Sequence, residues 1–437
     1  MPTLLIRAFR APDLRKKILF TLGVIGLFRF GQILPAPGVN VVAVRECLRG
    51  TGGGFADMLQ LFSGGAMLKL SVFALGIIPY ITASILVQLL TVMVPRLAAL
   101  RKEGSRGQAR ITQYTRYLTV ALAVLQATTV VAMARTGGIF PTCRREVLYD
   151  AGPAASAVVV VTMVAGTCVV MRLGELITDR GVGNGMSMLI FVQVVAVFPS
   201  YVSTVFVLSP FALAAMLLSG VVLVAAVVAM EQAQRRIPVQ YAKRTAGRRM
   251  YGGTSTYLPL KVNQAGIVPV IFASSLISLP QLATQAAGGT GPVAEWVAYH
   301  LASGSHPVYV AAYLSLITAF TYFYVSITFD PVEVAENMKR YGGFVPGIRP
   351  GRPTAEYLRF TLSRLTAPGA AYLAALSLIP IIAFVILRDP ATQQNFPFGG
   401  TTVLIMVGVG LETVKQVEAQ LEQRAYTGFL RGSPART

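Results

Sequence analysis

The sequence predicts an all-α protein that crosses a membrane ten times. Of its 437 residues, 54% are hydrophobic, and the mean hydropathy is positive. Only 13% are charged, against about 25% in an ordinary soluble domain. A membrane-spanning helix needs ~20 mostly apolar residues. Ten stretches meet this need, at 18–35, 70–94, 117–135, 154–172, 185–199, 210–230, 264–284, 308–328, 367–387 and 400–419.

Lysine and arginine are concentrated on alternate connections between these stretches. Of the 38, 30 lie in 1–17, 95–116, 172–183, 231–262, 329–366 and from Lys415 onward, and seven lie on the other connections. The positive-inside rule makes the basic segments cytoplasmic, which places both termini there and requires an even number of spans. The net charge of +20 would suggest nucleic acid binding in a soluble protein, but here it sets the topology.

The first apolar stretch is predicted to be a retained span. It follows Arg15, Lys16 and Lys17, as a secretory signal would, but no small-x-small cleavage site precedes the Leu34-Pro35-Ala36-Pro37 sequence. The first half of the protein therefore runs over 18–199, after a cytoplasmic N-terminus at 1–17.

Three cysteines are present. Cys168 falls within a span, whereas Cys47 and Cys143 fall on outward connections, where a disulfide is chemically permitted. Spacing along the chain does not show proximity, so the sequence leaves open a bridge or two free thiols and favours the free thiols.

The ten spans divide into two sets of five, and because five is odd, a repeated second half is inverted in the membrane. The segments Gly76–Ile85 and Gly266–Ser275 are identical at six of ten positions, and each lies in the second span of its half. Interruptions by glycine and proline at matching places mark the functional centre of inverted-repeat membrane proteins. The second half is assigned to 210–419, with a cytoplasmic tail at 420–437.

The connections differ in character between the two sides. Those at 231–262 and 329–366 are long, basic and cytoplasmic, which favours a binding role on that face. The first outward connection has a glycine-flanked segment at about 53–64, too short to span a membrane and expected to be a helix tucked into the protein or lying at the interface. Its apolar face consists of Phe55, Met58, Leu59 and Phe62. The outward connection 285–307 suggests no function.

The spans hold few residues that could do chemistry. Arg29 and Glu412 are interpreted as snorkelling or interhelical partners rather than relay groups. No Walker A sequence, metal-ligand cluster or nucleophile arrangement occurs, and both histidines, His300 and His306, lie in an outward connection. The sequence therefore predicts a protein that is not an enzyme and has no cofactor. The alternative, an ion-coupled secondary transporter with inverted repeats, is disfavoured by the lack of charges in the spans; lipid scrambling or insertase activity is a third possibility.

Aliphatic side chains occupy the matched positions of the repeat. Ile81 and Ile85 come from the first half and Ile271 from the second. Such residues usually face lipid or pack between helices. If they converge, they form a hydrophobic constriction that excludes ions by dewetting, and such a constriction could open around a wide substrate.

Eight motifs spread over most of the chain resemble those of the bacterial SecY family, in order and at family spacing. They are Phe73–Ile81, Gln88–Thr91, Gln113–Tyr117, Gly181–Gly185, Tyr241–Arg244, Leu258–Asn263, Phe344–Gly351 and Phe398–Thr401. The resemblance implies a clamshell of two inverted five-helix halves in the bacterial cell membrane, hinged between spans 5 and 6. It also implies a lateral gate between spans 2/3 and 7/8, through which signal sequences leave sideways into lipid while secreted chains cross through the middle.

The resemblance also implies residue roles. The segment 53–64 matches the plug, and Gln88 and Asn263 match polar residues of the gate, where a hydrogen bond between them would stabilise closure by ~0.6 to 2 kcal/mol. Met186 departs from the usual branched aliphatic residue, which predicts a more adaptable but leakier seal. The implied pore ring is Ile81, Ile85, Met186, Ile190, Ile271 and Ile405.

Partners are implied on the cytoplasmic face. Arg349 lies between two Pro-Gly turns that present its guanidinium for bidentate pairing, and the resemblance assigns it to coupling with the SecA motor or the ribosome. The other basic residues suit acidic protein surfaces or ribosomal RNA phosphates, although setting topology alone would also explain them. These are Lys243, Arg244, Arg248 and Arg249. Small subunits like SecE and SecG are implied by the resemblance alone, and signal sequences, secretory polypeptides and lipid complete the expected partners.

Overall fold

The fold is a bundle of long helices with a small sheet at one end. The computed structural model describes residues 11–50, 65–136, 147–149, 152–208, 210–241, 244–246, 249–251, 255–286, 291–301, 306–386 and 400–431. Each of the ten predicted spans overlaps one long helix.

The first half contains five spans and two short connecting helices. The spans are α2 (Pro12–Ile33), α5 (Ile78–Met93), α7 (Ser105–Thr136), α8 (Pro153–Arg180) and α9 (Gly185–Leu208), and the connecting helices are α3 (Val41–Gly50) and α6 (Pro95–Lys102).

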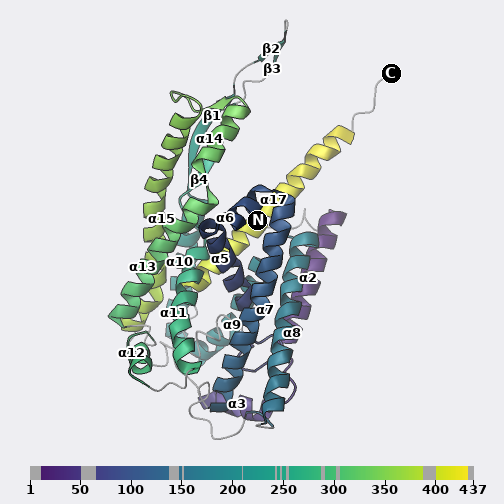
Figure 1. Ribbon diagram of the computed structural model, residues 1–437, viewed down its shortest axis with the longest axis vertical. Coiled ribbons are helices and arrows are strands. Elements are labelled where there is room, and N and C mark those ends of the chain that lie inside the picture. Colours follow the sequence, from purple (N-terminus) through teal and green to yellow (C-terminus); the bar gives the residue numbers. More distant parts are fainter. Residues whose placement is uncertain are drawn as a thin grey trace.

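The second half repeats this plan. Its spans are α10 (Pro210–Gln232), α11 (Val268–Ala286), α13 (Pro307–Thr328), α15 (Arg352–Ile386) and α17 (Gly400–Arg431), and its short helices are α12 (Pro292–His300) and α14 (Pro331–Arg340). Many of the helices begin with proline, whose fixed φ suits the first turn and whose missing N–H is not needed there. In Figure 1 the helices α2, α7 and α8 form one group and α11, α13 and α15 another, with α5 and α17 between them.

The spans differ in whether a single unbroken helix is long and apolar enough to cross the membrane. Within the described residues, four stretches are long and apolar enough to cross a membrane unbroken: Ser105–Arg135, Pro153–Arg180, Pro307–Arg340 and Arg352–Ile379. A fifth path, through α5 and α6, bends by 102° at Val94 and Pro95. Proline disfavours helical backbone in the residue before it, and Val94 is accordingly extended.

The second span departs most from the prediction. Its apolar stretch begins at residue 70, but helix α5 begins only at Ile78, and residues 65–77 form a series of turns. Gly76 has a φ of +55°, a left-handed conformation that no helix continues through. Gly76 therefore prevents α5 from extending further toward the N-terminus, which hydropathy alone does not register.

Close packing contacts are made at glycines. Gly31 of α2 lies against the ring of Phe73, and Gly185 at the start of α9 lies against the carbonyl of Gly174 in α8. Small residues let membrane helices approach closely, so a side chain at Gly185 would separate α9 from α8, and one at Gly31 would clash with the Phe73 ring.

The cysteines correct one expectation. Cys47, in α3, is disulfide-bonded, so the favoured interpretation of a free thiol at this position is wrong. Cys168 is a free thiol, and Cys143 lies outside the described residues. The error arose because sequence separation carries no information about whether two side chains meet.

The two long basic connections form a sheet, which an all-α prediction omitted. Strand β1 (Gln234–Tyr241) pairs antiparallel with β4 (Ser255–Lys261) on one side and β5 (Gly343–Phe344) on the other. A second ribbon pairs β2 (Arg244–Ala246) with β3 (Arg249–Tyr251). In β1, Ile237 and Val239 are buried and their neighbours are exposed, which is the period of two typical of a strand. This alternation covers too few residues to stand out beside ten apolar spans. Figure 1 shows this sheet and α14 at the end of the bundle opposite α3 and α12.

Candidate functional site

A cavity of about 1040 Å³ lies between the two halves. Its walls come from α5, α7, α8 and α9 on one side and from α10, α11, α13 and α17 on the other. One part of the lining is aliphatic, with Ile81, Ile190 and Ile271 among its members. The charged lining residues are Arg116, Glu175, Asp179, Glu231, Lys261, Glu412 and Lys415.

The inverted repeat seen in the sequence is also a repeat of backbone geometry. Gly76 has a φ of +55° and Gly266 a φ of +63°, and in each half a helix starts two residues later. Ile81 N donates to Ile77 O over 3.1 Å, and the matched Ile271 N donates to Ile267 O over 3.3 Å. The two glycines therefore place equivalent isoleucines, Ile81 and Ile271, one turn inside equivalent helices.

Aliphatic side chains from four helices meet in a central apolar cluster. Its buried members are Val194, Ile271, Ile405 and Val409, and the partly buried residues against them include Ile81 and Ile190. Four of the six ring residues implied by the resemblance thus lie in one cluster, contributed by α5, α9, α11 and α17.

The other two ring residues lie beside the cluster. Ile85 lines the cavity one turn after Ile81, and Met186 packs with Ile81 and Ile190 in a neighbouring cluster. The Met186 sulfur fills the space above Gly174. Sequence reasoning missed Val194 and Val409, although each is spaced four residues after a predicted member and so shares its helical face.

The gate residues lie on the same cavity but do not pair. Gln88 and Asn263 both line it, yet Asn263 Nδ2 donates to Glu231 Oε1 over 2.6 Å and to Gly266 O over 3.3 Å. Within the part of the chain that the structure describes, Asn263 Oδ1 accepts no hydrogen bond, so the bond to Gln88 that the resemblance implies is not formed in this structure. A carboxylate is a stronger acceptor than an amide, and Glu231 lies in the last turn of α10, next to the base of α11.

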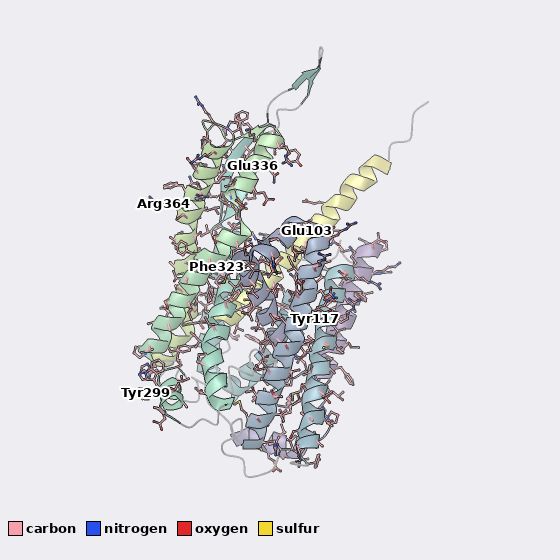
Figure 2. All side chains as sticks on the ribbon, viewed as in Figure 1. Glu103, Tyr117, Tyr299, Phe323, Glu336 and Arg364 are labelled. Carbon is pink, nitrogen blue, oxygen red and sulfur yellow. The ribbon has the colours of Figure 1, made fainter. Side chains whose placement is uncertain are left out.

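Charged side chains cluster where α7 and α8 line the cavity. Glu175 accepts from Arg116 Nε over 2.7 Å and from Arg172 Nη1 over 3.1 Å. Tyr117, labelled in Figure 2, follows Arg116 on α7 and accepts a hydrogen bond from Gln113. Elsewhere, Arg29 donates to Gln32 of its own helix over 2.7 Å.

Arg349 is exposed on a turn between β5 and α15. Gly347 and Gly351, on either side, have φ values of +81° and +103°, which side-chain-bearing residues rarely adopt. The Thr354 hydroxyl donates to the Arg349 carbonyl over 2.8 Å and ties the turn to the following helix. The backbone is thus fixed while the guanidinium is presented outward.

Other predicted residues are placed less fully. Arg244 lies in β2 and Arg249 in β3, whereas Lys243 and Arg248 lie outside the described residues. The plug segment 53–64, with Phe55, Met58, Leu59 and Phe62, also lies outside them.

The SecY family model matches residues 71–414, well over half of the chain. The chain belongs to the SecY family. It is 56% identical to the protein translocase subunit SecY of Streptomyces galbus over 440 residues, covering 99% of this chain and 100% of that protein. It is 54% identical to the same subunit of Mycobacterium tuberculosis over 437 residues, covering 98% and 99%.

Solved structures share the SecY fold. One of a protein-conducting channel has a TM-score of 0.62 at 17% identity, and one of a SecY protein with its plug domain has 0.64 at 19%; each covers 97% of this chain and 95% of the other. Sec61 in a canine ribosome–channel complex gives 0.63 at 18%. The chain thus has the ten-helix SecY clamshell architecture. It is a multi-pass membrane protein with two inverted halves.

Proposed function

We propose that this chain is the pore-forming subunit of a protein translocase. It passes unfolded polypeptides across the membrane and releases hydrophobic segments sideways into lipid. The observation that carries this proposal is the central apolar cluster, to which α5 and α9 of one half and α11 and α17 of the other contribute aliphatic side chains. A seal made by separable halves can widen to the diameter of a polypeptide, which a fixed solute site cannot do.

The pore ring in this proposal is Ile81, Ile85, Met186, Ile190, Ile271 and Ile405. Aliphatic walls hold water poorly, so a narrow ring of them blocks ions without any charged gate. An unfolded chain carries its own apolar and backbone surface and fills the opening as it passes. The ring therefore closes around the substrate instead of selecting its chemistry.

The lateral gate lies between α5 and α7 of the first half and α11 and α13 of the second. Support comes from the cavity, which is lined on both sides of this seam, and from the bend between α5 and α6. Gln88 and Asn263 are the polar residues along it. A signal helix that offers apolar contacts can insert at this seam and pass into lipid.

The plug is assigned to the segment 53–64, whose apolar face fits a helix seated in the outer funnel. A related structure is described as one in which the plug domain of a SecY protein stabilises the closed state and maintains a membrane seal. The same role is proposed here, as a second barrier beyond the ring.

The cytoplasmic face carries the proposed partners. Arg349, Lys243, Arg244, Arg248 and Arg249 would bind the SecA ATPase or the ribosome, and SecE and SecG would complete the channel. The chain itself supplies no energy: it is not an enzyme in this proposal, and direction comes from the motor or from translation. Both termini are cytoplasmic, and the membrane is the bacterial cell membrane.

Crosslinking to a stalled precursor tests the proposal. Single cysteines replace Ile81, Ile271 or Ile405 in a Cys168→Ser background, and Val161 and Val221, exposed on α8 and α10, provide lipid-facing controls. A secretory precursor with one cysteine is stalled with its motor in membranes. Disulfide adducts at the three ring positions and not at the controls are expected. An engaged precursor that gives no ring adducts would overturn the ring and favour the transporter alternative.

A further inference from the structure

The only tryptophan and both histidines of the chain meet at one place. Trp296 and His300 of α12 stack with ring centroids 4.7 Å apart, and His300 lies 4.8 Å from His306 at the start of α13. Tyr299 packs edge-on against both histidines, at 4.9 and 5.4 Å. We call Trp296, Tyr299, His300 and His306 the outer aromatic patch.

One side of the patch packs against the helix bundle, and the other side is exposed. On α12, Val297 is buried and faces the bundle, where the helix packs against α11 and α13. On its other side Trp296 is 51% exposed and Tyr299 67% exposed, next to an exposed Val293. Aromatic rings of this size are therefore fixed in place by one another, with one face left open.

The hydrogen bonds within the patch determine which polar atoms remain available. His300 Nδ1 lies 3.0 Å from the Trp296 carbonyl, which can only accept, so Nδ1 donates, and in the neutral ring Nε2 is an acceptor. His306 Nδ1 accepts from Val308 N over 3.3 Å, so its neutral ring carries the proton on Nε2. With the tyrosine hydroxyl and indole N–H, the patch combines apolar rings with both donors and acceptors.

Charge excludes one class of partner. No lysine or arginine occurs from Asn263 to Met338, a stretch that includes α11, α12 and α13. A nucleic acid or a strongly acidic protein would need basic side chains here. Tryptophan and tyrosine, whose apolar rings carry a polar edge, are typical of the belts that membrane proteins place at the lipid–water interface.

The position of the patch agrees with that class. Figure 2 shows Tyr299 at the end of α11 and α13 that lies farthest from Glu336 of α14 and from the sheet. α11 and α13 are membrane spans of a SecY-family fold, so their ends lie at an interface. Leu276 of α11 and Val308 of α13 are exposed apolar residues, so the lipid-facing flank of these spans continues toward the patch.

We propose that the outer aromatic patch docks α12 into the phospholipid headgroup layer, with the rings at the level of the glycerol backbone and the polar edges toward the phosphates. This anchor holds the outer ends of α11 and α13 at a fixed depth. It rests on membership of the SecY family and not on the proposed translocation. If α11 and α13 also form one side of the gate, that side is fastened to lipid and the α5/α7 side moves against it.

Tryptophan fluorescence tests the anchor directly, because Trp296 is the only source of the signal. The full chain is reconstituted in phosphatidylcholine–phosphatidylglycerol vesicles in which the lipid carries bromine either near the head or near the end of the acyl chain. We expect the shallow bromines to quench on the order of twofold more than the deep ones, and aqueous iodide to quench weakly.

Relocated tryptophans calibrate the result in a Trp296→Phe background. Tyr257→Trp, on exposed β4, is expected to respond to iodide alone, and Val221→Trp, on exposed α10, to brominated lipid alone. Iodide quenching of Trp296 without lipid quenching would overturn the anchor and place the patch in water, available to an outward protein partner. Quenching by deep bromines equal to or above that by shallow ones would also overturn it. Precursor crosslinking at the ring is scored separately, so loss of translocation and loss of the anchor are distinguishable.

Discussion

The side-chain amide of Asn263 donates a hydrogen bond to Glu231 Oε1 over 2.6 Å. These residues lie 32 apart in sequence, at the end of α10 and just before α11, and the β1–β4 hairpin lies between them. The hairpin pairs Gln234 with Lys261, and Val262 N donates to Ala233 O over 3.0 Å. The Glu231–Asn263 bond therefore closes the base of the hairpin where it joins a gate helix.

Removing the carboxylate should loosen the base of α11. In Glu231→Ala, the Asn263 side chain, only 3% exposed, loses its best acceptor, at a cost of about 1–3 kcal/mol. We expect a higher resting ion leak, measured as iodide flux into proteoliposomes. Glu231→Gln keeps an acceptor at the same length and should leak less than the alanine variant. Equal leaks from Glu231→Ala and the unmodified chain would contradict this role.

The pairing of Asn263 can be measured by double-mutant cycles on thermal unfolding in detergent. Coupling between Glu231 and Asn263 should be about 0.6 to 1.7 kcal/mol, the range for hydrogen bonds between membrane helices. Coupling between Gln88 and Asn263 should be near zero, since the Asn263 amide donates elsewhere. A larger coupling for the Gln88 pair would restore the partner expected from the family resemblance.

A polar side chain in the central apolar cluster should wet it. Ile405 is buried against Ile271, and Ile405→Ser places a hydroxyl at the constriction. We expect resting ion conductance in planar bilayers to rise on the order of tenfold, which corresponds to about 1.4 kcal/mol of barrier. The matched control, Val221→Ser on the exposed side of α10, should leave conductance unchanged.

The two repeat glycines should differ in their tolerance of alanine. Both have positive φ, which costs a side-chain-bearing residue about 1–2 kcal/mol. At Gly76 the added carbon would also clash with the Gln193 amide, whereas at Gly266 it would meet open space. Gly76→Ala should therefore lower the melting temperature more than Gly266→Ala. Equal losses would show that backbone strain alone sets the cost.

The presentation of Arg349 predicts a loss of coupling without a loss of fold. Arg349→Lys keeps the charge but not the bidentate geometry, and motor-driven translocation into vesicles should fall several-fold. Arg352→Lys is the matched control, because Arg352 is exposed and its ion pair with Glu356 can be kept by lysine. Unchanged melting temperatures in both variants would locate the effect in partner binding.

Much of the architecture was predictable because each membrane-spanning helix requires a long apolar stretch, which is visible in the sequence. Hydropathy located the ten spans, and the matched glycines located the equivalent Ile81 and Ile271. Local sequence patterns did not predict a role for Glu231, because its contact with Asn263 depends on the fold of the intervening hairpin. The same limit applies to Cys47, whose disulfide bond no local pattern indicated. The start of α5 was misplaced because apolar residues extend back across Gly76, before which the backbone is not helical.

The pairing of β1 with β5 has a consequence for how partners share this protein. Gln240 of β1 pairs with Phe344 of β5. The β2–β3 ribbon with Arg244 and Arg249 follows β1 along the chain, and the turn with Arg349 follows β5, so both begin at the same sheet. On the proposed assignment, a motor and a ribosome would recognise parts of the same footprint. They would then compete for this surface. Whichever of the two is bound would decide whether a polypeptide is exported during or after its synthesis.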